Sequence, residues 1–473
     1  MSAIRSFPIP QDVAAIRARL DHPIIDADGH LIEIMPMVYE IVGEMFGQAK
    51  GREYRDYMRS RHHPEVPAFT AARVFWGLPE ENTLDRMTVT LPRLMRARMD
   101  EMGMDFALLY PTSGLTVMGY PQEEMRRMGT RALNTYYARL LGEFKDRMTP
   151  VAVIPTYTPQ EAIEELEYAV RTLGLKCAVM SAVIPRTHRP DGTAQDWLDT
   201  LGHDSLYDYD PLWAKCVELG VVPAFHAIGY GWGSRFSKKN YVYNHLGNFA
   251  AAQEAACRSL FMGGVPKRFP NLRFSFLEGG VGWAAQLYSD IHGHYDKRNK
   301  DAIQMFDPRH FDVALCNELF DAYGPSQMSA TAREQYVQVA GMYKGTPPPD
   351  PSKYDDFAES RIQSADDIVA VFRDQFYFGC EADDPMNALA FKPEMLPFRL
   401  RMNAMFASDI GHWDVPDLRG VLPEAWELVE DGHIGTGDFR DFTFGNVARM
   451  LTAVNPKFFD GTAVADAVRG GIG

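Results

Sequence analysis

The sequence has no disulfide-like cysteine pattern, no basic block and no long apolar run. Its five cysteines (Cys177, Cys216, Cys257, Cys316 and Cys380) are scattered without a Cys-x-x-Cys motif, which indicates reduced thiols rather than a disulfide scaffold. Lysine and arginine total 48 against 63 aspartates and glutamates, a net charge of −15 that argues against nucleic acid or an anionic membrane as partner. No stretch approaches the roughly 18 apolar residues of a membrane span, and residues 1–20 lack a signal-peptide core. We therefore expect a cytoplasmic protein with a small-molecule substrate.

The chain contains enough apolar residues to form a large hydrophobic core. The chain has 473 residues, of which 46% are hydrophobic and 23% charged. This composition excludes global disorder and fits one large domain or two ordinary ones.

Short apolar, β-branched or aromatic runs alternate with helical patterns along the chain. Eight interleaved strands imply parallel β/α units, and a count of eight favours an α/β fold of the closed (β/α)₈ TIM-barrel type over an open doubly wound sheet. The predicted strands are 22–28, 106–111, 150–155, 177–183, 221–225, 272–277, 375–380 and 402–407. The predicted helices between and after them are 123–148, 160–173, 211–219, 248–262 and 423–431.

Two long segments interrupt this alternation, about 31–103 and 297–372. Both are too long for bare loops, so we expect each to contain helices. Because both begin at the carboxyl end of a strand, we expect them to lie over the mouth of the barrel as lids. The predicted domain organisation is an N-terminal arm (1–21), a barrel (22–452) and a C-terminal tail (453–473).

Potential metal ligands recur at the ends of the predicted strands. Asp28 and His30 lie two residues apart in Asp26-Ala27-Asp28-Gly29-His30, and alternate residues of a strand point to the same face. His226, Glu278 and Asp409 follow strands five, six and eight. The carboxyl ends of barrel strands converge on one mouth, and mixed imidazole and carboxylate ligation suits Zn²⁺, Mn²⁺ or Fe²⁺.

Each of these residues also has a purely structural interpretation. Asp28 or Asp409 could stabilise a turn, His30 could be a hydrogen-bonded loop histidine, and His226 a satisfied core histidine. Glu278 could cap the helix that is predicted to start near Val281. Their joint placement at four strand ends favours the metal site.

Taken together, the motifs resemble the amidohydrolase superfamily. The similarity is to the amidohydrolase-related branch that includes aminocarboxymuconate semialdehyde decarboxylase and the aromatic-acid decarboxylases. It rests on Asp28-Gly29-His30 after strand one, His226 after strand five and Ser408-Asp409-x-x-His412 after strand eight. Decarboxylases of the family usually carry His-Gly-Gly after strand six, whereas this chain has Glu278-Gly279-Gly280.

The resemblance implies one divalent metal ion per chain, with zinc expected first and manganese or iron as alternatives. It implies Asp28, His30, His226 and Asp409 as ligands and Asp409 as the general base for a metal-activated water. Glu278 would be a further ligand, a hydrogen-bond anchor for a ligand histidine, or an acid/base group. His412 would orient Asp409 or bind substrate. The family habit also predicts a homodimer or a larger homo-oligomer.

Aromatic and basic residues near the strand ends are candidates for substrate binding. Their rings could stack on a substrate ring, and an arginine could pair with a carboxylate, although ordinary loop packing explains the aromatic residues equally well. The candidates are Tyr110, Tyr230, Trp232, Arg235 and Trp283.

Three functions remain open at this point. The first is a metal-dependent hydrolase of an amide, ester or lactone-like bond. The second is a metal-dependent, non-oxidative decarboxylase of an aromatic or unsaturated acid. The third is a non-catalytic binding protein on a barrel scaffold, which the apparently complete ligand set disfavours. The missing strand-six histidine favours the hydrolase over the decarboxylase.

Overall fold

The fold was analysed in a computed structural model of the chain. The structure describes residues 6–61, 78–227, 235–339 and 353–471. Within these residues no helix combines the length and the apolar character that a membrane crossing requires.

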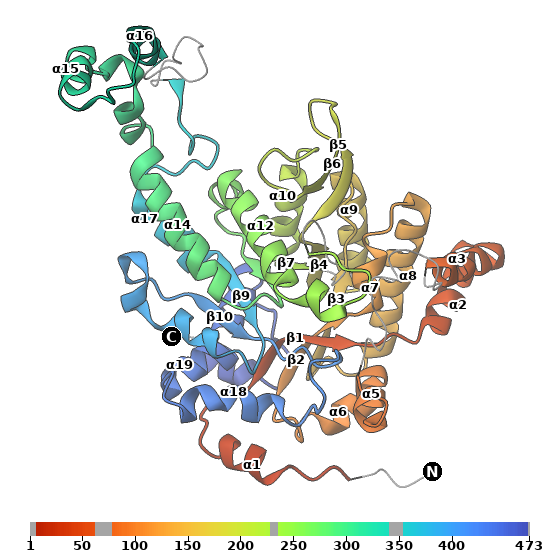
Figure 1. The fold of residues 1–473 in the computed structure, drawn as a ribbon. Helices are drawn as coiled ribbons and strands as arrows, with labels where there is room; N and C mark the ends of the chain where they lie inside the picture. Colours follow the sequence, from red (N-terminus) through yellow and green to blue (C-terminus); the bar gives the residue numbers. More distant parts are fainter. Residues whose placement is uncertain (1–5, 62–77, 228–234, 340–352, 472–473) are drawn as a thin grey trace.

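Eight parallel strands form a barrel that is surrounded by helices (Figure 1). Neighbouring strands pair in the order β1-β2-β3-β4-β7-β8-β9-β10. Backbone hydrogen bonds close the ring: the His30 amide donates to the Ile410 carbonyl (2.8 Å), and the Asp409 amide to the Asp28 carbonyl (2.9 Å). The strands are β1 (Ile25–Leu31), β2 (Phe106–Pro111), β3 (Met148–Val153), β4 (Cys177–Ser181), β7 (Pro223–His226), β8 (Phe274–Phe276), β9 (Phe376–Cys380) and β10 (Asn403–Phe406).

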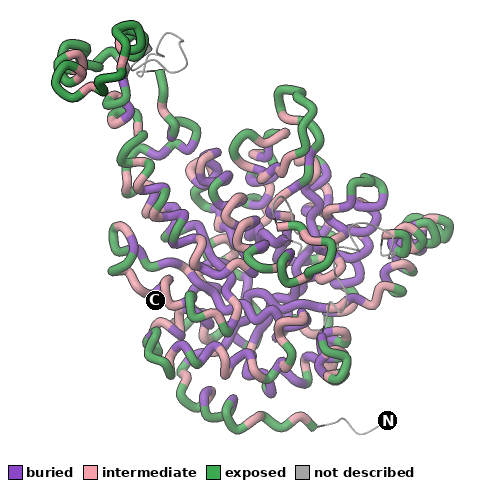
Figure 2. Tube along the Cα trace, in the orientation of Figure 1, coloured by how far each residue is buried: buried purple, intermediate pink, exposed green. Residues whose placement is uncertain are grey.

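The predicted (β/α)₈ barrel is therefore confirmed. Each predicted strand overlaps a barrel strand, and the boundaries differ by no more than three residues. Strand one was predicted to end at Asp28 but continues to Leu31, so Asp28 and His30 lie inside the strand. Figure 2 shows the strands as the buried centre of the molecule, as expected for a parallel sheet that helices cover on its outer face.

Two of the predicted helices have nearly the expected bounds, and a third is shorter than predicted. The predicted helix 211–219 is α10, and Gly220 ends it in the left-handed conformation (φ 66°). The predicted helix 248–262 is α12 with the same bounds. The predicted helix 123–148 is too long, because α8 ends at Leu141 and Met148 already begins β3. The helices of the barrel and its C-terminal part are α7 (Ser113–Val117), α8 (Glu123–Leu141), α9 (Pro159–Glu167), α10 (Asp210–Leu219), α11 (Tyr241–His245), α12 (Asn248–Met262), α13 (Val265–Arg268), α14 (Gly282–Arg298), α17 (Ala365–Asp374), α18 (Val421–Glu430), α19 (Thr436–Arg440), α20 (Asn446–Val454) and α21 (Ala465–Gly471).

Both long insertions contain helices, as predicted. The first holds α2 (Met35–Phe46), α3 (Gln48–Arg61), α5 (Thr83–Thr90) and α6 (Pro92–Arg98), and α2 and α3 lie beside α8 (Figure 1). The second holds α15 (Val313–Tyr323) and α16 (Ala330–Val339). Figure 1 shows α15 and α16 extending beyond the end of α14, away from the barrel strands, so this part of the second insertion does not cover the mouth.

Several elements were not predicted, among them two at the periphery of the barrel. A short helix, α1 (Gln11–Arg17), lies in the N-terminal segment, and an antiparallel hairpin of β5 (Ile184–His188) and β6 (Ala194–Asp199) follows β4. The hairpin is mostly polar and exposed, so it lacks the apolar alternation that signals a strand. A buried ion pair between Arg186 and Asp199 (3.1 Å) joins its two strands, and Arg186 also donates to the Tyr157 carbonyl (2.8 Å) in the segment after β3.

Candidate metal centre

β1 carries three polar side chains into the barrel interior. Asp26, Asp28 and His30 each have no exposed surface. A register shift between Asp26 and Gly29 bends the strand at this point. A side chain at Gly29 could not fit, because its first carbon would lie 2.6 Å from the Asp26 carboxylate and 3.1 Å from Ile410. The glycine thus allows the polar residues of β1 to approach the segment that follows β10.

Three other strand ends deliver the remaining candidates. His226 is the last residue of β7, Glu278 lies two residues after β8, and Asp409 three residues after β10. Glu278 (φ 57°) and Asp409 (φ 53°) adopt the left-handed backbone conformation, which costs of order 1–3 kcal/mol in a residue other than glycine. The fold holds both carboxylates in place despite this cost.

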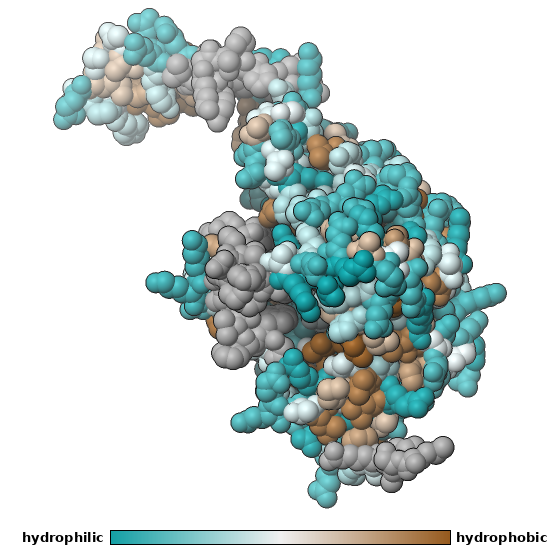
Figure 3. All heavy atoms as spheres, turned by 90° about the vertical axis from the view of Figure 1, so that its right-hand side faces the viewer, coloured by the Kyte–Doolittle hydropathy of each residue, from teal (hydrophilic) through white to brown (hydrophobic). Residues whose placement is uncertain are grey.

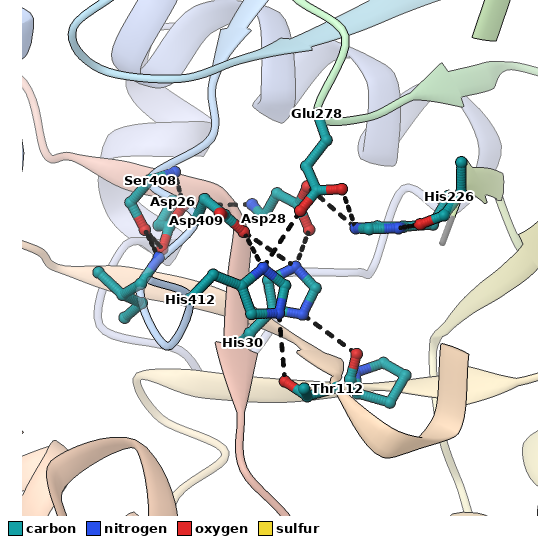
Figure 4. Close-up of polar contacts among 12 residues, drawn as sticks. Asp26, Asp28, His30, Thr112, His226, Glu278, Ser408, Asp409 and His412 are labelled. Atoms are coloured by element: carbon teal, nitrogen blue, oxygen red, sulfur yellow. Dashed lines mark hydrogen bonds and ion pairs between the residues drawn. The ribbon is translucent and has the colours of Figure 1, made fainter. Parts of the chain in front are cut away.

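These side chains meet in one buried cluster (Figure 4). The His30 Nε2 atom lies 3.4 Å from Asp28 Oδ1 and 3.3 Å from Asp409 Oδ1. The His226 Nε2 atom lies 3.2 Å from Glu278 Oε2 and 4.0 Å from Asp28 Oδ2. His412 lies beside His30, with ring centroids 4.0 Å apart, and its Nδ1 is 2.7 Å from Asp409 Oδ1 and 3.2 Å from Glu278 Oε1. All five predicted metal and acid/base positions are therefore adjacent, and His412 is adjacent to them.

The hydrogen bonds of the two histidines fix which nitrogen faces the cluster. Nδ1 of His30 donates to the Pro111 carbonyl (3.1 Å), and Nδ1 of His226 donates to the Ala227 carbonyl (2.8 Å). Each imidazole therefore presents an Nε2 lone pair to the cluster, the usual arrangement in histidines that bind metals.

The atoms that face the cluster's centre are buried without hydrogen-bond partners among the described residues. They are His30 Nε2, His226 Nε2, both Asp28 carboxylate oxygens, Glu278 Oε2 and Asp409 Oδ1. Buried polar atoms without partners cost free energy, and several converging on one point need a common partner. A divalent cation fits this set of nitrogen and oxygen donors.

Burial shifts the protonation of the cluster in the absence of a cation. Burial raises the pKa of Asp28 to about 6. Burial, with the neighbouring carboxylates, also raises the pKa of Glu278 and Asp409 well above their usual range. Burial lowers the pKa of His226 to about 3 and that of His30 well below its usual value. Neutral imidazoles beside closely spaced carboxyl groups suit a cation.

Comparison with known proteins identifies the family. The profile of the amidohydrolase family matches residues 25–347, which is more than half of the chain. This chain is an amidohydrolase-family protein. The resemblance that the strand-end motifs indicated is thereby confirmed.

Solved structures similar to this amidohydrolase share its fold at low sequence identity. One is an amidohydrolase from Mycobacterium avium subsp. paratuberculosis, with 16% identity, a TM-score of 0.53 and coverage of 91% of this chain and 100% of that one. Another is dihydroxybenzoic acid decarboxylase from a Polaromonas species with bound manganese and 2-nitroresorcinol. It has 13% identity, a TM-score of 0.50 and coverage of 93% of this chain and 99% of that one. A third is 5-carboxyvanillate decarboxylase from Novosphingobium aromaticivorans with manganese and 4-hydroxy-3-methoxy-5-nitrobenzoic acid. It has 13% identity, a TM-score of 0.50 and coverage of 95% of this chain and 100% of that one.

Hydrogen bonds in the structure test the structural interpretations of Glu278 and Asp28. Glu278 makes no capping bond to α14, so it is not a helix cap. Asp26, rather than Asp28, stabilises the turn of β1 by accepting from the Asp28 amide (3.1 Å). Asp26 also accepts from the Ser408 amide (2.9 Å) and hydroxyl (2.6 Å). The sequence analysis missed this role, because a buried aspartate contact across the barrel leaves no local pattern.

Glu33 is a second residue that sequence reasoning missed. Its carboxylate accepts from the backbone amides of Thr112 (3.1 Å), Ser113 (2.8 Å) and Gly114 (3.2 Å) and from the Tyr137 hydroxyl. The Thr112 hydroxyl in turn lies 3.4 Å from His412 Nε2. Glu33 therefore positions the segment after β2 beside the cluster. Its closeness in sequence to His30 was the only signal available.

The structure places only some of the predicted substrate-binding residues near the cluster. The ring of Tyr110 lies 6.0 Å from that of His30 and 6.4 Å from that of His226. Trp283 packs on Phe276 and Phe378 (6.0 and 5.5 Å), and Arg235 donates to the Leu246 carbonyl (2.9 Å). These contacts do not join Trp283 and Arg235 to the cluster. Tyr230 and Trp232 lie outside the described residues.

An aromatic group that was not predicted extends from the cluster. The ring of Phe249 lies 6.3 Å from that of His226 and 4.9 Å from that of His245, which lies 5.4 Å from Trp413. These residues come from α11, α12 and the segment after β10. Their sequence separation hides the grouping, although Trp413 follows His412 directly.

Proposed function

We propose that this amidohydrolase is a metal-dependent hydrolase of an amide or ester bond in a small, aromatic substrate. The observation that carries the proposal is the convergence of unpartnered nitrogen and oxygen atoms on one buried point. One divalent ion would be held by Asp28, His30, His226 and Asp409, with Glu278 beside it. The donor set suits zinc, and the manganese in similar structures makes manganese the second candidate.

In this proposal the protein groups position the reactants and move the protons. A divalent ion held there would lower the pKa of water and polarise a carbonyl. Asp409 would accept the proton of the attacking water, as a carboxylate held at the reaction centre can. His412, at 2.7 Å from Asp409, would keep that carboxylate oriented. Tyr110 and Phe249 would provide ring faces for an aromatic substrate.

Charge favours hydrolysis of a neutral substrate over decarboxylation of an anionic one. The groups that raise the pKa of Asp409 besides burial are all acids: Glu278, Asp414, Glu381 and Asp28. In the described part of the chain, no lysine or arginine is among the groups that shift the pKa of Asp409 or Glu278. Apart from the positive charge of the bound ion, such surroundings repel a substrate carboxylate.

A non-oxidative decarboxylase of an aromatic acid is the second candidate. It is supported by the two manganese-containing structures of similar fold, which are decarboxylases of dihydroxybenzoic acid and 5-carboxyvanillate. At 13% identity the similarity to these structures supports a shared fold, and the reaction of this chain has to be tested by experiment.

One assay separates the candidates. Purified protein is loaded with zinc or manganese and incubated with aryl amides, aryl esters and hydroxylated benzoic acids, and both carboxylate products and CO₂ are measured. We expect a carboxylate product without CO₂. Release of CO₂ would instead establish the decarboxylase. Stoichiometric metal without turnover on any substrate would favour a binding protein.

A further inference from the structure

We propose that the α15–α16 hairpin is a self-association surface, on which the same hairpin of a second copy packs to form a four-helix bundle. The hairpin projects from the barrel, and Figure 2 shows it as exposed or half-buried along almost its whole length. α15 has no buried residue, although most of its side chains are apolar. The proposal is independent of the reaction that the barrel catalyses.

The two helices contact each other along one side. The rings of Phe320 and Tyr336 lie 5.3 Å apart. Arg333 of α16 donates to the Asn317 carbonyl (2.5 Å) and pairs with Asp321 (2.5 Å). These contacts define a helical hairpin, but they leave it without a core of its own.

A second side of α15 presents apolar residues to solvent. Leu315, Leu319 and Tyr323 recur every fourth residue and so form one stripe along the helix. Their exposed fractions are 48%, 48% and 83%. Apolar side chains also stand out on the hairpin at the upper left of Figure 3. A water-facing stripe of this kind marks a contact surface.

The stripe borders a hollow that could receive side chains of a partner. It has a volume of about 580 Å³, and its lining includes Phe311, Leu315, Cys316, Leu319, Phe320 and Tyr323. With Tyr336, which lines the same hollow, the exposed area of these side chains is on the order of 600 Å² per chain, which approaches the roughly 800 Å² that each partner buries in a standard interface. The area therefore suits a stable dimer.

The shortness of α15 and α16 indicates that a partner covers their apolar stripe permanently. Helices shorter than about 12–15 residues are marginal in water by themselves, and α15 and α16 have 11 and 10 residues. Within the described part of the chain, α15 and α16 make few contacts with the barrel, so these helices need another partner. The lining of the hollow is mostly apolar, with Asp312 and His310 as its acidic and basic residues, and a mostly apolar face is typical of obligate interfaces.

A second copy of this chain is the partner that meets these requirements. It is present whenever the protein is, and it offers the same apolar stripe. Packing the two stripes against each other about a two-fold axis is isologous and closes at a dimer. Two antiparallel helix pairs joined face to face form a four-helix bundle, a stable solution for such hairpins.

The mass of the protein in solution tests the proposal. We compare wild type with Leu315→Glu/Leu319→Glu by analytical ultracentrifugation at micromolar concentration. A matched control, Thr331→Glu/Gln338→Glu, places two glutamates at exposed positions of α16. On a helical projection both lie away from Arg333 and Tyr336, the residues that contact α15. Hydrogen exchange of α15 is measured in all three proteins.

We expect an even multiple of the 53.3 kDa chain mass for wild type and for the control, and half of that mass for the leucine variant. The amides of α15 should exchange slowly in wild type and at least ten-fold faster in the variant. Unchanged thermal unfolding of the barrel would show that the variant is folded. A monomeric wild type, an unchanged mass in the leucine variant, or equal dissociation of the control would each overturn the proposal.

Discussion

At the residue scale, the candidate site depends on a small number of unfavourable local conformations. Glu278 and Asp409 both have positive φ, and the first directly precedes Gly279-Gly280. Backbone strain of this kind persists only where surrounding contacts enforce it. For Asp409, the enforcing contacts are its backbone bond to Asp28 and the Asp26–Ser408 bonds beside it.

Asp26 is the residue whose substitution should disturb the site without removing a proposed metal ligand. Asp26→Ala deletes the acceptor for three hydrogen bonds and leaves buried donors on Asp28 and Ser408. We expect the free energy of unfolding to fall by about 3 kcal/mol and metal affinity to fall about 10–100-fold, measured by denaturant unfolding and metal titration. Asp26→Asn, which keeps one acceptor oxygen, should lose less. Equal losses in the two variants would contradict the proposed role.

Asp409 should matter for turnover more than for folding. Asp409→Asn keeps the side-chain shape, and asparagine tolerates positive φ. We expect the rate constant of turnover to fall about 10²–10⁴-fold, as for loss of a general base. The free energy of unfolding of the metal-free protein should not fall, because a buried carboxyl among other acids is removed. Turnover within a few-fold of wild type would exclude Asp409 as the base.

At the scale of elements, buried charge pairs link the helices outside the barrel. α8 and α9 are joined by Arg126 with Glu161 (2.7 Å) and by Arg131 with Glu165 (2.7 Å). Asn134 of α8 bridges Glu165 and the backbone of β3. These contacts hold two successive β/α units in register.

Glu165 makes this helix pair sensitive to pH. Burial raises its pKa to about 7 from an ordinary value near 4.5. The folded protein therefore holds this proton more tightly than the unfolded chain does, and stability falls as pH rises from about 4.5 to about 7. Glu165→Gln should remove that component, up to about 3 kcal/mol between pH 4.5 and pH 8.

The measurement is urea unfolding of wild type and Glu165→Gln at both pH values. Glu164→Gln is the control, since Glu164 lies on the same helix and its side chain is 40% exposed, whereas that of Glu165 is 5% exposed. Parallel pH profiles for wild type and Glu165→Gln would contradict the assignment.

At the scale of the whole molecule, metal binding should stabilise the barrel, because the proposed ligands come from β1 and from the ends of β7, β8 and β10. Zinc or manganese added to chelated protein at 100 times its dissociation constant should stabilise the fold by about 2.7 kcal/mol, seen as a higher melting temperature.

Two histidine variants locate this effect. His226→Ala should lose the metal-induced rise in melting temperature. His203→Ala should keep it, although His203 forms an exposed group with Asp204 and Glu359 that could also hold a metal ion. If His203→Ala abolished the rise instead, the buried cluster would not be the principal metal site.

The sequence by itself determined the barrel and most members of the site. Parallel strands that are buried on both faces are near-continuous apolar runs, and such runs indicated the eight strands, although β1 also carries Asp26, Asp28 and His30. The candidate ligands follow those runs directly, so Asp28, His30, His226, Glu278, Asp409 and His412 could be located from local spacing.

Tertiary structure alone decided how those residues meet. The left-handed backbone at Glu278 and Asp409, the Asp26–Ser408 contact and the support from Glu33 all join residues from different strands or depend on the closed ring. The sequence of the second insertion indicated only that the segment was too long for a bare loop. The direction in which α15 and α16 project from the barrel depends on where α14 ends. Local patterns reflect the burial of one segment, whereas these features result from contacts between segments that are distant in the sequence.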